Sequence, residues 1–171
     1  MRIVLSGSHA VGKTSLLNLL DIPGHKKIPE MPRQVIYEWQ QLPHEMTPER
    51  FLEFQLELSK RQAVAERGGN FVADRGLYDF MAYVRDLSDE NIVQETNEHI
   101  LQLIDGYDYI FYIPIEFQLA VDDVRKNSSE YQKEIDRRLL QIYQDLNVPY
   151  IIISGSIEDR LAQIYRAIKL T

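Results

Sequence analysis

Four short apolar runs along the chain have the pattern of buried strands rather than of amphipathic helices. They are residues 2–6 (RIVLS), 70–74 (NFVAD), 109–113 (YIFYI) and 150–154 (YIIIS). Strands that are apolar on both faces are typical of parallel sheets covered by helices on both sides. We therefore expect these runs to form the centre of a three-layer α/β fold.

Between these runs, apolar residues recur at intervals of three and four, which is the spacing of amphipathic helices. Thr47 followed by Pro48 predicts a helix start. Capping residues are also predicted at Ser88, at Ser129 with Gln132, and at Ser156 with Asp159. The expected helices cover residues 13–20, 48 until Gly68, 76–84, 88 until Gly106, 129–146 and 156–168.

Length, charge and cysteine content narrow the classes of protein. The chain has 171 residues, a formal net charge of −7 and no cysteine. This length predicts one domain spanning residues 1–171. The negative charge disfavours non-specific nucleic-acid binding, and the missing thiols exclude disulfides, thiolate zinc sites and cysteine nucleophiles. No apolar run is long enough to span a bilayer or to form a signal peptide, so we expect a cytoplasmic protein without a membrane partner.

One motif carries specific chemistry. Residues 7–14 (GSHAVGKT) fit the pattern G-x-x-x-x-G-K-[ST] without a mismatch, directly after a predicted strand and at the start of a predicted helix. Loop amides and the helix N-terminus would hold a β-phosphate, Lys13 would reach the β- and γ-phosphates, and Thr14 would bind Mg²⁺. His9 is expected to face solvent or to lie near the nucleotide. The predicted nucleotide-binding residues are Gly7, Ser8, His9, Ala10, Val11, Gly12, Lys13, Thr14 and Ser15.

A carboxylate is predicted beside this loop. Asp74 ends the apolar run 70–74, so it should emerge at the carboxyl edge of the sheet, where ligands bind in such folds. Asp74 could order the Mg²⁺ shell or accept the proton of an attacking hydroxyl, and Arg75 could hold an acceptor or stabilise developing charge. The alternative is that Asp74 only caps the next helix through Gly76.

Together with residues 7–14, the segment 74–83 (DRGLYDFMAY) resembles P-loop nucleoside and nucleotide kinases. In particular, the chain is similar to the AAA-like ATPase/kinase group that includes the ribosylnicotinamide kinase domain. Further similar segments are 29–33, 124–125 with 131–136, and 148–155 with 158–161. The resemblance implies a P-loop NTPase fold with a parallel sheet of about five strands, and ATP and Mg²⁺ as cofactors.

The resemblance also implies roles around the acceptor. Asp74 would be the catalytic or metal-ordering acid, and Arg75 would contact the acceptor or a phosphate, as in deoxynucleoside and thymidylate kinases. Glu30 and Arg33 would face the acceptor. Tyr78 either flanks the acceptor or packs in the core.

A second group of residues is implied on the nucleotide side. Arg125 falls in a lid-like segment, about residues 116–130, where it either stabilises the transferring phosphoryl group or is simply solvated. Gly155 and Ser156 match the segment that packs against the adenine in similar kinases, and they can also cap the final helix.

These features predict a Mg²⁺-dependent kinase, a monomer or a homodimer, that moves the ATP γ-phosphoryl group to a nucleoside, nucleotide or nucleotide-like acceptor. One alternative acceptor is a hydroxymethylated base such as 5-hydroxymethyluracil in phage DNA, for which Lys26, Lys27, Arg33 and Arg50 could form a local basic cleft. The other alternative is a nucleotide-binding switch or sensor that transfers nothing. The absence of an N-K-x-D guanine motif from the sequence disfavours a GTPase switch.

Overall fold

The computed structural model describes residues 1–85, 89–116 and 129–169. Its centre is a parallel sheet of five strands in the order β2-β3-β1-β4-β5, which confirms the predicted α/β class. The strands are β1 (Arg2–Ser6), β2 (Lys26–Ile28), β3 (Phe71–Asp74), β4 (Tyr109–Tyr112) and β5 (Ile151–Ile152).

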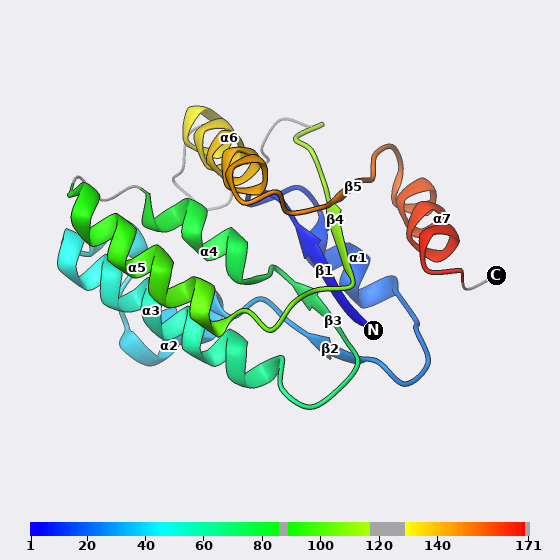
Figure 1. Ribbon diagram of the computed structural model, residues 1–171, viewed down its shortest axis with the longest axis horizontal. Helices are drawn as coiled ribbons and strands as arrows, with labels where there is room; N and C mark the ends of the chain where they lie inside the picture. Colours follow the sequence, from blue (N-terminus) through cyan, green and yellow to red (C-terminus); the bar gives the residue numbers. More distant parts are fainter. Residues whose placement is uncertain (86–88, 117–128, 170–171) are drawn as a thin grey trace.

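Helices cover both faces of the sheet (Figure 1). One face is covered by α3, α4, α5 and α6, with α2 beside α3, and the other face is covered by α1 and α7. None of the helices in the described ranges is long and apolar enough to cross a lipid bilayer. The helices are α1 (Lys13–Leu19), α2 (Pro32–Trp39), the 3₁₀ turn η1 (Pro43–Glu45), α3 (Pro48–Ala65), α4 (Leu77–Val84), α5 (Glu90–Leu103), α6 (Ser129–Asp145) and α7 (Ile157–Ala167).

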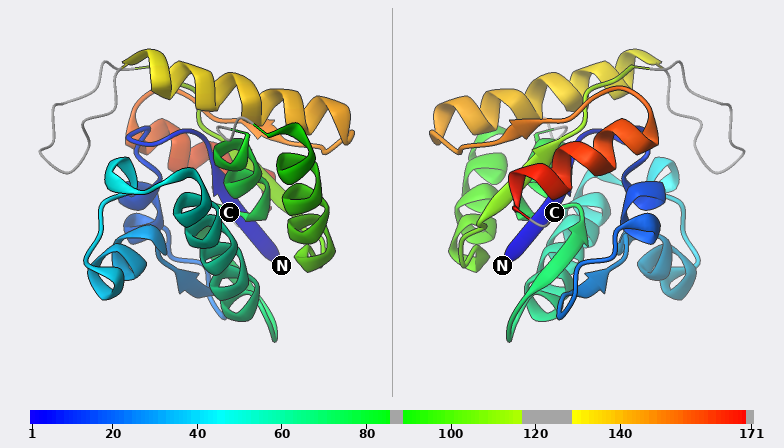
Figure 2. Two further views of the ribbon diagram at one scale, coloured as in Figure 1. Left: turned by 90° about the vertical axis from the view of Figure 1, so that its left-hand side faces the viewer. Right: turned by 90° about the vertical axis from the view of Figure 1, so that its right-hand side faces the viewer.

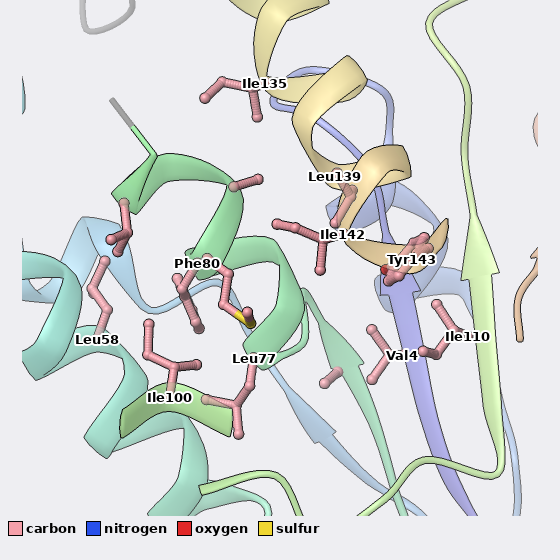
Figure 3. Packing of buried hydrophobic residues seen from close by; sticks show 14 of the residues in the cluster. Val4, Leu58, Leu77, Phe80, Ile100, Ile110, Ile135, Leu139, Ile142 and Tyr143 are labelled. Atoms are coloured by element: carbon pink, nitrogen blue, oxygen red, sulfur yellow. The ribbon is translucent and has the colours of Figure 1, made fainter. Parts of the chain in front are cut away.

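Two hydrophobic cores form because the side chains of each central strand alternate between the faces. On β1, Val4 faces the larger core, whereas Ile3 and Leu5 face the smaller one under α1 and α7. Figure 3 shows the larger core, where Leu77 of α4 lies close to Ile100 of α5. Both faces of the central strands are therefore buried, as their apolar runs predict.

Two of the predicted helix caps are confirmed. Thr47 accepts a hydrogen bond from the Arg50 amide, and Ser156 and Asp159 form a capping box on α7. The cap of α5 is Asp89, whose side chain accepts the amides of the first turn, and the predicted cap Ser88 lies outside the described residues. Gln132 does not cap α6: its side chain is buried and donates to the carbonyl of His9.

Both edge strands depart from the prediction. The short strand β2 was not predicted, because Lys26–Ile28 has only one buried apolar residue and therefore no strand-like hydrophobic pattern. The predicted strand 150–154 shortens to Ile151–Ile152, and both residues are exposed. Because β5 has a neighbour on one side only, its apolar side chains are not sandwiched between two helical layers. Only Ile153, after the strand, is fully buried.

The sheet order brings two polar segments together at one edge. β1 lies between β3 and β4, and Leu5 pairs with Asp74 of β3. Since the strands are parallel, the loop after β1 and the turn after β3 emerge side by side. Figure 2 shows α6 lying across this end of the sheet. Residues 7–14 and the turn that follows Asp74 therefore lie beside each other at this edge of the sheet.

Candidate active site

The loop of residues 7–14, called the P-loop below, has the backbone of an anion cradle. Gly7 and Gly12 have φ values of 138° and 95°, and a side chain at Gly7 would come within 2.6 Å of the Ile113 carbonyl oxygen. In the described part of the chain, the N–H groups of residues 10–15 have no hydrogen-bond partner. These amides at the start of α1 are available to phosphate oxygens.

Lys13 lies over the P-loop rather than in solvent. Its side chain is buried, and Nζ donates to the carbonyl oxygens of Gly7 at 2.8 Å and Ser8 at 2.6 Å. Burial, followed by the nearby positive charge of Arg75, lowers the pKa of Lys13 to about 8. The lysine is therefore placed beside the free amides, with its charge at the position where phosphates would bind.

Thr14 and Asp74 connect the P-loop to β3. The Thr14 hydroxyl donates to Asp74 Oδ2 at 2.5 Å, whereas the buried Asp74 Oδ1 has no hydrogen-bond partner among the described residues. A hydroxyl and a carboxylate are the hard oxygen ligands that Mg²⁺ prefers. The described residues contain no cluster of three carboxylate, histidine or cysteine side chains able to hold a metal alone. The residues therefore fit a Mg²⁺ ion that also binds phosphate oxygens and water.

Arg75 is held firmly at the turn after β3. Its φ is 83°, a conformation that is costly for a residue other than glycine. The Arg75 amide donates to the Leu5 carbonyl at 3.0 Å, and Nη2 donates to Glu30 Oε1 at 2.9 Å. The guanidinium also lies 5.0 Å from the ring centre of Tyr83. A buried positive charge is thus fixed at the turn that carries Asp74.

These groups line one cleft of about 580 Å³. The cleft runs from the P-loop to the segment after β2, so nucleotide and acceptor residues predicted far apart in the chain share one space. Arg33 lies at its rim, with Nε 3.9 Å from Glu30 Oε2. The lining residues are Ala10, Gly12, Lys13, Thr14, Ser15, Pro29, Glu30, Arg33, Asp74 and Arg75.

The first part of the P-loop is covered by α6. His9 is 4% exposed, so the expectation that it faces solvent is wrong. Its ring lies 6.0 Å from that of Tyr131, and its carbonyl accepts the Gln132 side chain at 2.6 Å. Ser8 is also fully buried. Neither side chain lines the cleft, because α6 packs over this half of the loop.

The other side of the P-loop is supported from α7 by Arg160, which the sequence analysis did not single out. Arg160 donates to the Val11 carbonyl at 2.8 Å and to Glu116 Oε2 at 2.7 Å. The Gly155 amide donates to the same Glu116 carboxylate at 3.1 Å. Gly155 and Ser156 thus lie outside the cleft, and Gly155 is joined to the P-loop through the ion pair of Glu116 with Arg160.

The remaining predicted residues lie either away from the cleft or outside the described part of the chain. Tyr78 packs edge to face against Tyr107 and Tyr143, and it belongs to the larger core. Arg125 and residues 117–128 of the lid-like segment lie outside the described residues.

Of the four residues of the possible basic cleft, only Arg33 lines the site. Lys26 and Lys27 donate to backbone carbonyls, and Arg50 binds Glu53 and stacks over Trp39.

Asp79 is a further residue at this site that the sequence analysis did not select. It is the only charged residue in α4 (LYDFMAYV), and it is 1% exposed. Its carboxylate accepts from the Gly7 amide at 3.1 Å and from the Gly76 amide at 3.0 Å. A lone acid within an otherwise buried, apolar helix is the sequence signal that could have identified it.

The five-stranded parallel sheet with a P-loop after β1 defines the fold as that of P-loop kinases. The model of the AAA domain family matches residues 2–160, so the chain belongs to that family. No match was found among the curated proteins.

Solved structures with this fold include nucleoside and nucleotide kinases. Deoxyadenosine kinase from M. mycoides with the products dCMP and dCDP has a TM-score of 0.75 at 13% identity, covering 99% of this chain and 98% of that chain. Thymidylate kinase from Candida albicans has a TM-score of 0.60 at 19% identity, covering 98% and 90%. NadR protein in complex with NR has a TM-score of 0.75 at 13% identity, and the match covers 96% of this chain and 50% of that chain.

Proposed function

We propose that the protein is a Mg²⁺-dependent kinase that transfers the ATP γ-phosphoryl group to a nucleoside, a nucleotide or a nucleotide-like acceptor. The observation that carries this proposal is the 2.5 Å hydrogen bond from Thr14 to Asp74, next to the ion pair of Arg75 with Glu30. A nucleotide-binding loop alone would serve a switch equally well. A second cluster of charged residues on the same cleft is what a phosphoryl acceptor requires.

On the nucleotide side, the free amides of residues 10–15 would bind the phosphates, and Lys13 would exchange its bonds to loop carbonyls for bonds to phosphate oxygens. We propose that Gly155 and Ser156 lie towards the adenine. The link of Gly155 through Glu116 and Arg160 to the P-loop supports this placement.

Thr14 and Asp74 would hold Mg²⁺, which supplies charge neutralisation at the phosphates when bound. Asp74 has two oxygens with different surroundings: Oδ2 accepts from Thr14, and Oδ1 has no partner among the described residues. Of the two roles considered for Asp74, this geometry favours ordering of the metal shell.

On the acceptor side, Glu30, Arg33 and Arg75 would position the incoming group. Arg75 is held by Glu30, so its charge is fixed before the acceptor arrives, and this preorganisation lowers the cost of stabilising the transferring phosphoryl group. The proposed roles of Asp74 and Arg75 therefore depend on a fixed distance between the turn after β3 and the P-loop. The names of the kinases that share the fold support a nucleoside or nucleotide acceptor.

The test is transfer of label from γ-labelled ATP with Mg²⁺ to nucleosides, nucleoside monophosphates, ribosylnicotinamide and DNA containing hydroxymethyluracil. Label on one acceptor, reduced at least about 100-fold in Asp74→Asn, supports the kinase. Asp21→Asn removes an exposed acid outside the cleft and serves as the matched control. Label on the DNA alone would favour the modified base as acceptor. ATP binding with no labelled acceptor would contradict the proposal and favour a switch.

A further inference from the structure

Asp79 contacts two segments that are assigned to different substrates. Oδ1 accepts from the amide of Gly7, the first residue of the P-loop, at 3.1 Å. Oδ2 accepts from the amide of Gly76, which follows Asp74 and Arg75, at 3.0 Å. One carboxylate group therefore joins the loop that would bind ATP to the turn that would serve the metal and the acceptor.

Helix capping explains only one of these contacts. Asp79 is the third residue of α4, and its bond to the Gly76 amide is half of a capping box. A cap needs no bond to a residue 72 positions away, yet Asp79 also binds Gly7. Moreover, capping residues are usually exposed, whereas Asp79 is 1% exposed and lies in an otherwise apolar helix. The contact with Gly7 therefore calls for a separate explanation.

The carboxylate is kept in place by further hydrogen bonds. The Ser6 hydroxyl lies 3.1 and 3.0 Å from the two oxygens of Asp79 and donates to them. Tyr143 lies 2.6 Å from Ser6 Oγ, and because the hydrogen of Ser6 is directed at Asp79, Tyr143 donates to Ser6. Figure 3 shows Tyr143 extending from α6 to the end of β1. The chain of contacts thus includes β1, α4 and α6.

The close packing around the turn leaves little room for alternative positions. A side chain at Gly76 would come within 2.9 Å of Val4 and 3.3 Å of the Tyr107 hydroxyl. The Leu77 amide donates to the same hydroxyl at 3.0 Å. The turn is therefore closely packed against β1. The bonds of Asp79 also join it to the P-loop.

We propose that Asp79 is a positioning residue that fixes the P-loop relative to the turn carrying Asp74 and Arg75. This inference rests on the proposed function, because it assigns ATP and the acceptor to the two segments. Asp79 itself does not line the cleft. It acts on the reaction by keeping the two halves of the site at the distance that in-line transfer requires, where an error of about 1 Å can cost about 100-fold in rate.

The kinetic test is Asp79→Asn. The amide has nearly the shape of the carboxylate, but its NH₂ group cannot accept, so only one of the bonds from Gly7 and Gly76 can remain. We expect kcat to fall about tenfold or more, with ATP affinity changed by less than about threefold, because each segment still binds its own substrate. Unchanged kcat in a folded Asp79→Asn protein would overturn the inference.

Glu66→Gln is the matched control. Glu66 is a second buried carboxylate, 3% exposed, that binds Gln62 and Tyr107 and does not contact the P-loop. We expect this variant to keep kcat within about threefold even where its melting temperature falls as much as that of Asp79→Asn. Gln62 and Tyr107 contact the same turn at the Arg75 carbonyl and the Leu77 amide, so equal kcat losses in the two variants would show that support of the turn alone has this effect, and would contradict a specific role of the Asp79 link to the P-loop.

Amide hydrogen exchange tests the contact without any acceptor. We expect at least one of the Gly7 and Gly76 amides to exchange faster in Asp79→Asn than in the unmodified protein, and the β1 amides to be unchanged. Asn keeps one accepting oxygen, so protection at one glycine can remain, but protection retained at both glycines would overturn the inference. If Asp79→Asn does not fold, Ser6→Ala decides: it removes one donor to Asp79, so the Gly7 and Gly76 amides should exchange faster, and unchanged exchange at both would overturn the inference. An unmodified protein that transfers no label would instead contradict the proposed function, and the exchange result would still test Asp79.

Discussion

Arg75 and Glu30 form an ion pair between Nη2 and Oε1 at 2.9 Å, with only 6% and 12% of their side chains exposed. The pair joins the turn after β3 to the segment after β2, two strands that are neighbours in the sheet. Glu30 also lies 3.9 Å from Arg33, which is 65% exposed. One carboxylate therefore has a buried partner and an exposed one, and their contributions can be separated.

Glu30→Ala should destabilise the fold strongly, because it leaves the Arg75 charge buried without its carboxylate. Breaking a buried pair from one side costs about 3 to 5 kcal/mol. Arg33→Ala, which removes the exposed partner, should cost less than about 1 kcal/mol. Urea unfolding followed by circular dichroism measures both. Similar small losses in the two variants would show that Arg75 does not depend on Glu30.

Lys13 should make ATP binding dependent on pH. Burial and Arg75 lower the pKa of its ammonium group to about 8, so the free protein loses this positive charge as the pH rises through 8. Bound phosphates favour the charged form, and ATP binding above pH 8 must therefore take up a proton. We expect ATP affinity to weaken by up to about tenfold per pH unit above 8. Calorimetric titrations with ATP at pH 7, 8 and 9 measure this change in affinity.

The control is Lys13→Met, which should bind ATP more weakly and with an affinity that does not depend on pH in this range. The same decrease of affinity with pH in this variant would contradict the assignment to Lys13.

Gly7→Ala should weaken ATP binding, whereas Gly69→Ala should not. Their φ values, 138° and 132°, are nearly the same, so the two variants share the backbone strain of about 1 to 3 kcal/mol. Only at Gly7 does the added methyl group meet a neighbour, the Ile113 carbonyl oxygen at 2.6 Å. The loop must shift, and we expect ATP affinity to fall about tenfold or more. Equal ATP affinities in the two folded variants would contradict this view of the P-loop.

The end of β5 predicts a contrast between two adjacent isoleucines. Ile153 is fully buried, and Ile153→Ala should cost about 2 to 5 kcal/mol. Ile152 is 58% exposed, and Ile152→Ala should cost less than about 1 kcal/mol. Unfolding of both variants in urea measures the difference. Equal costs would indicate that Ile152 is covered in solution.

The central part of the fold was predictable from sequence because its signals are local. The runs that became β1, β3 and β4 are apolar on both faces, and the P-loop pattern occurs within eight consecutive residues. The position of Asp74 at the edge of the sheet follows from its place at the end of a strand. The edges were less predictable: β2 is short and polar, and the exposure of β5 depends on its having a single neighbour.

Contacts between distant segments required the structure. Gln132 seemed to be a cap because it lies three residues after Ser129, but packing of α6 over the P-loop directs it to His9. His9 is buried for the same reason. The ion pair of Glu30 with Arg75 also joins residues 45 positions apart.

By itself, the sequence determined that this is a P-loop α/β protein, because strand and helix periodicity and the phosphate-binding motif depend on residues that are adjacent in the chain. Only the tertiary structure decided which charged groups meet. Asp79 lies 72 positions from Gly7, and the order of β3, β1 and β4 in the sheet is what brings the two together. Hydrogen bonds and ion pairs act over a few ångströms, so their partners are set by the packing of the elements and not by spacing along the chain.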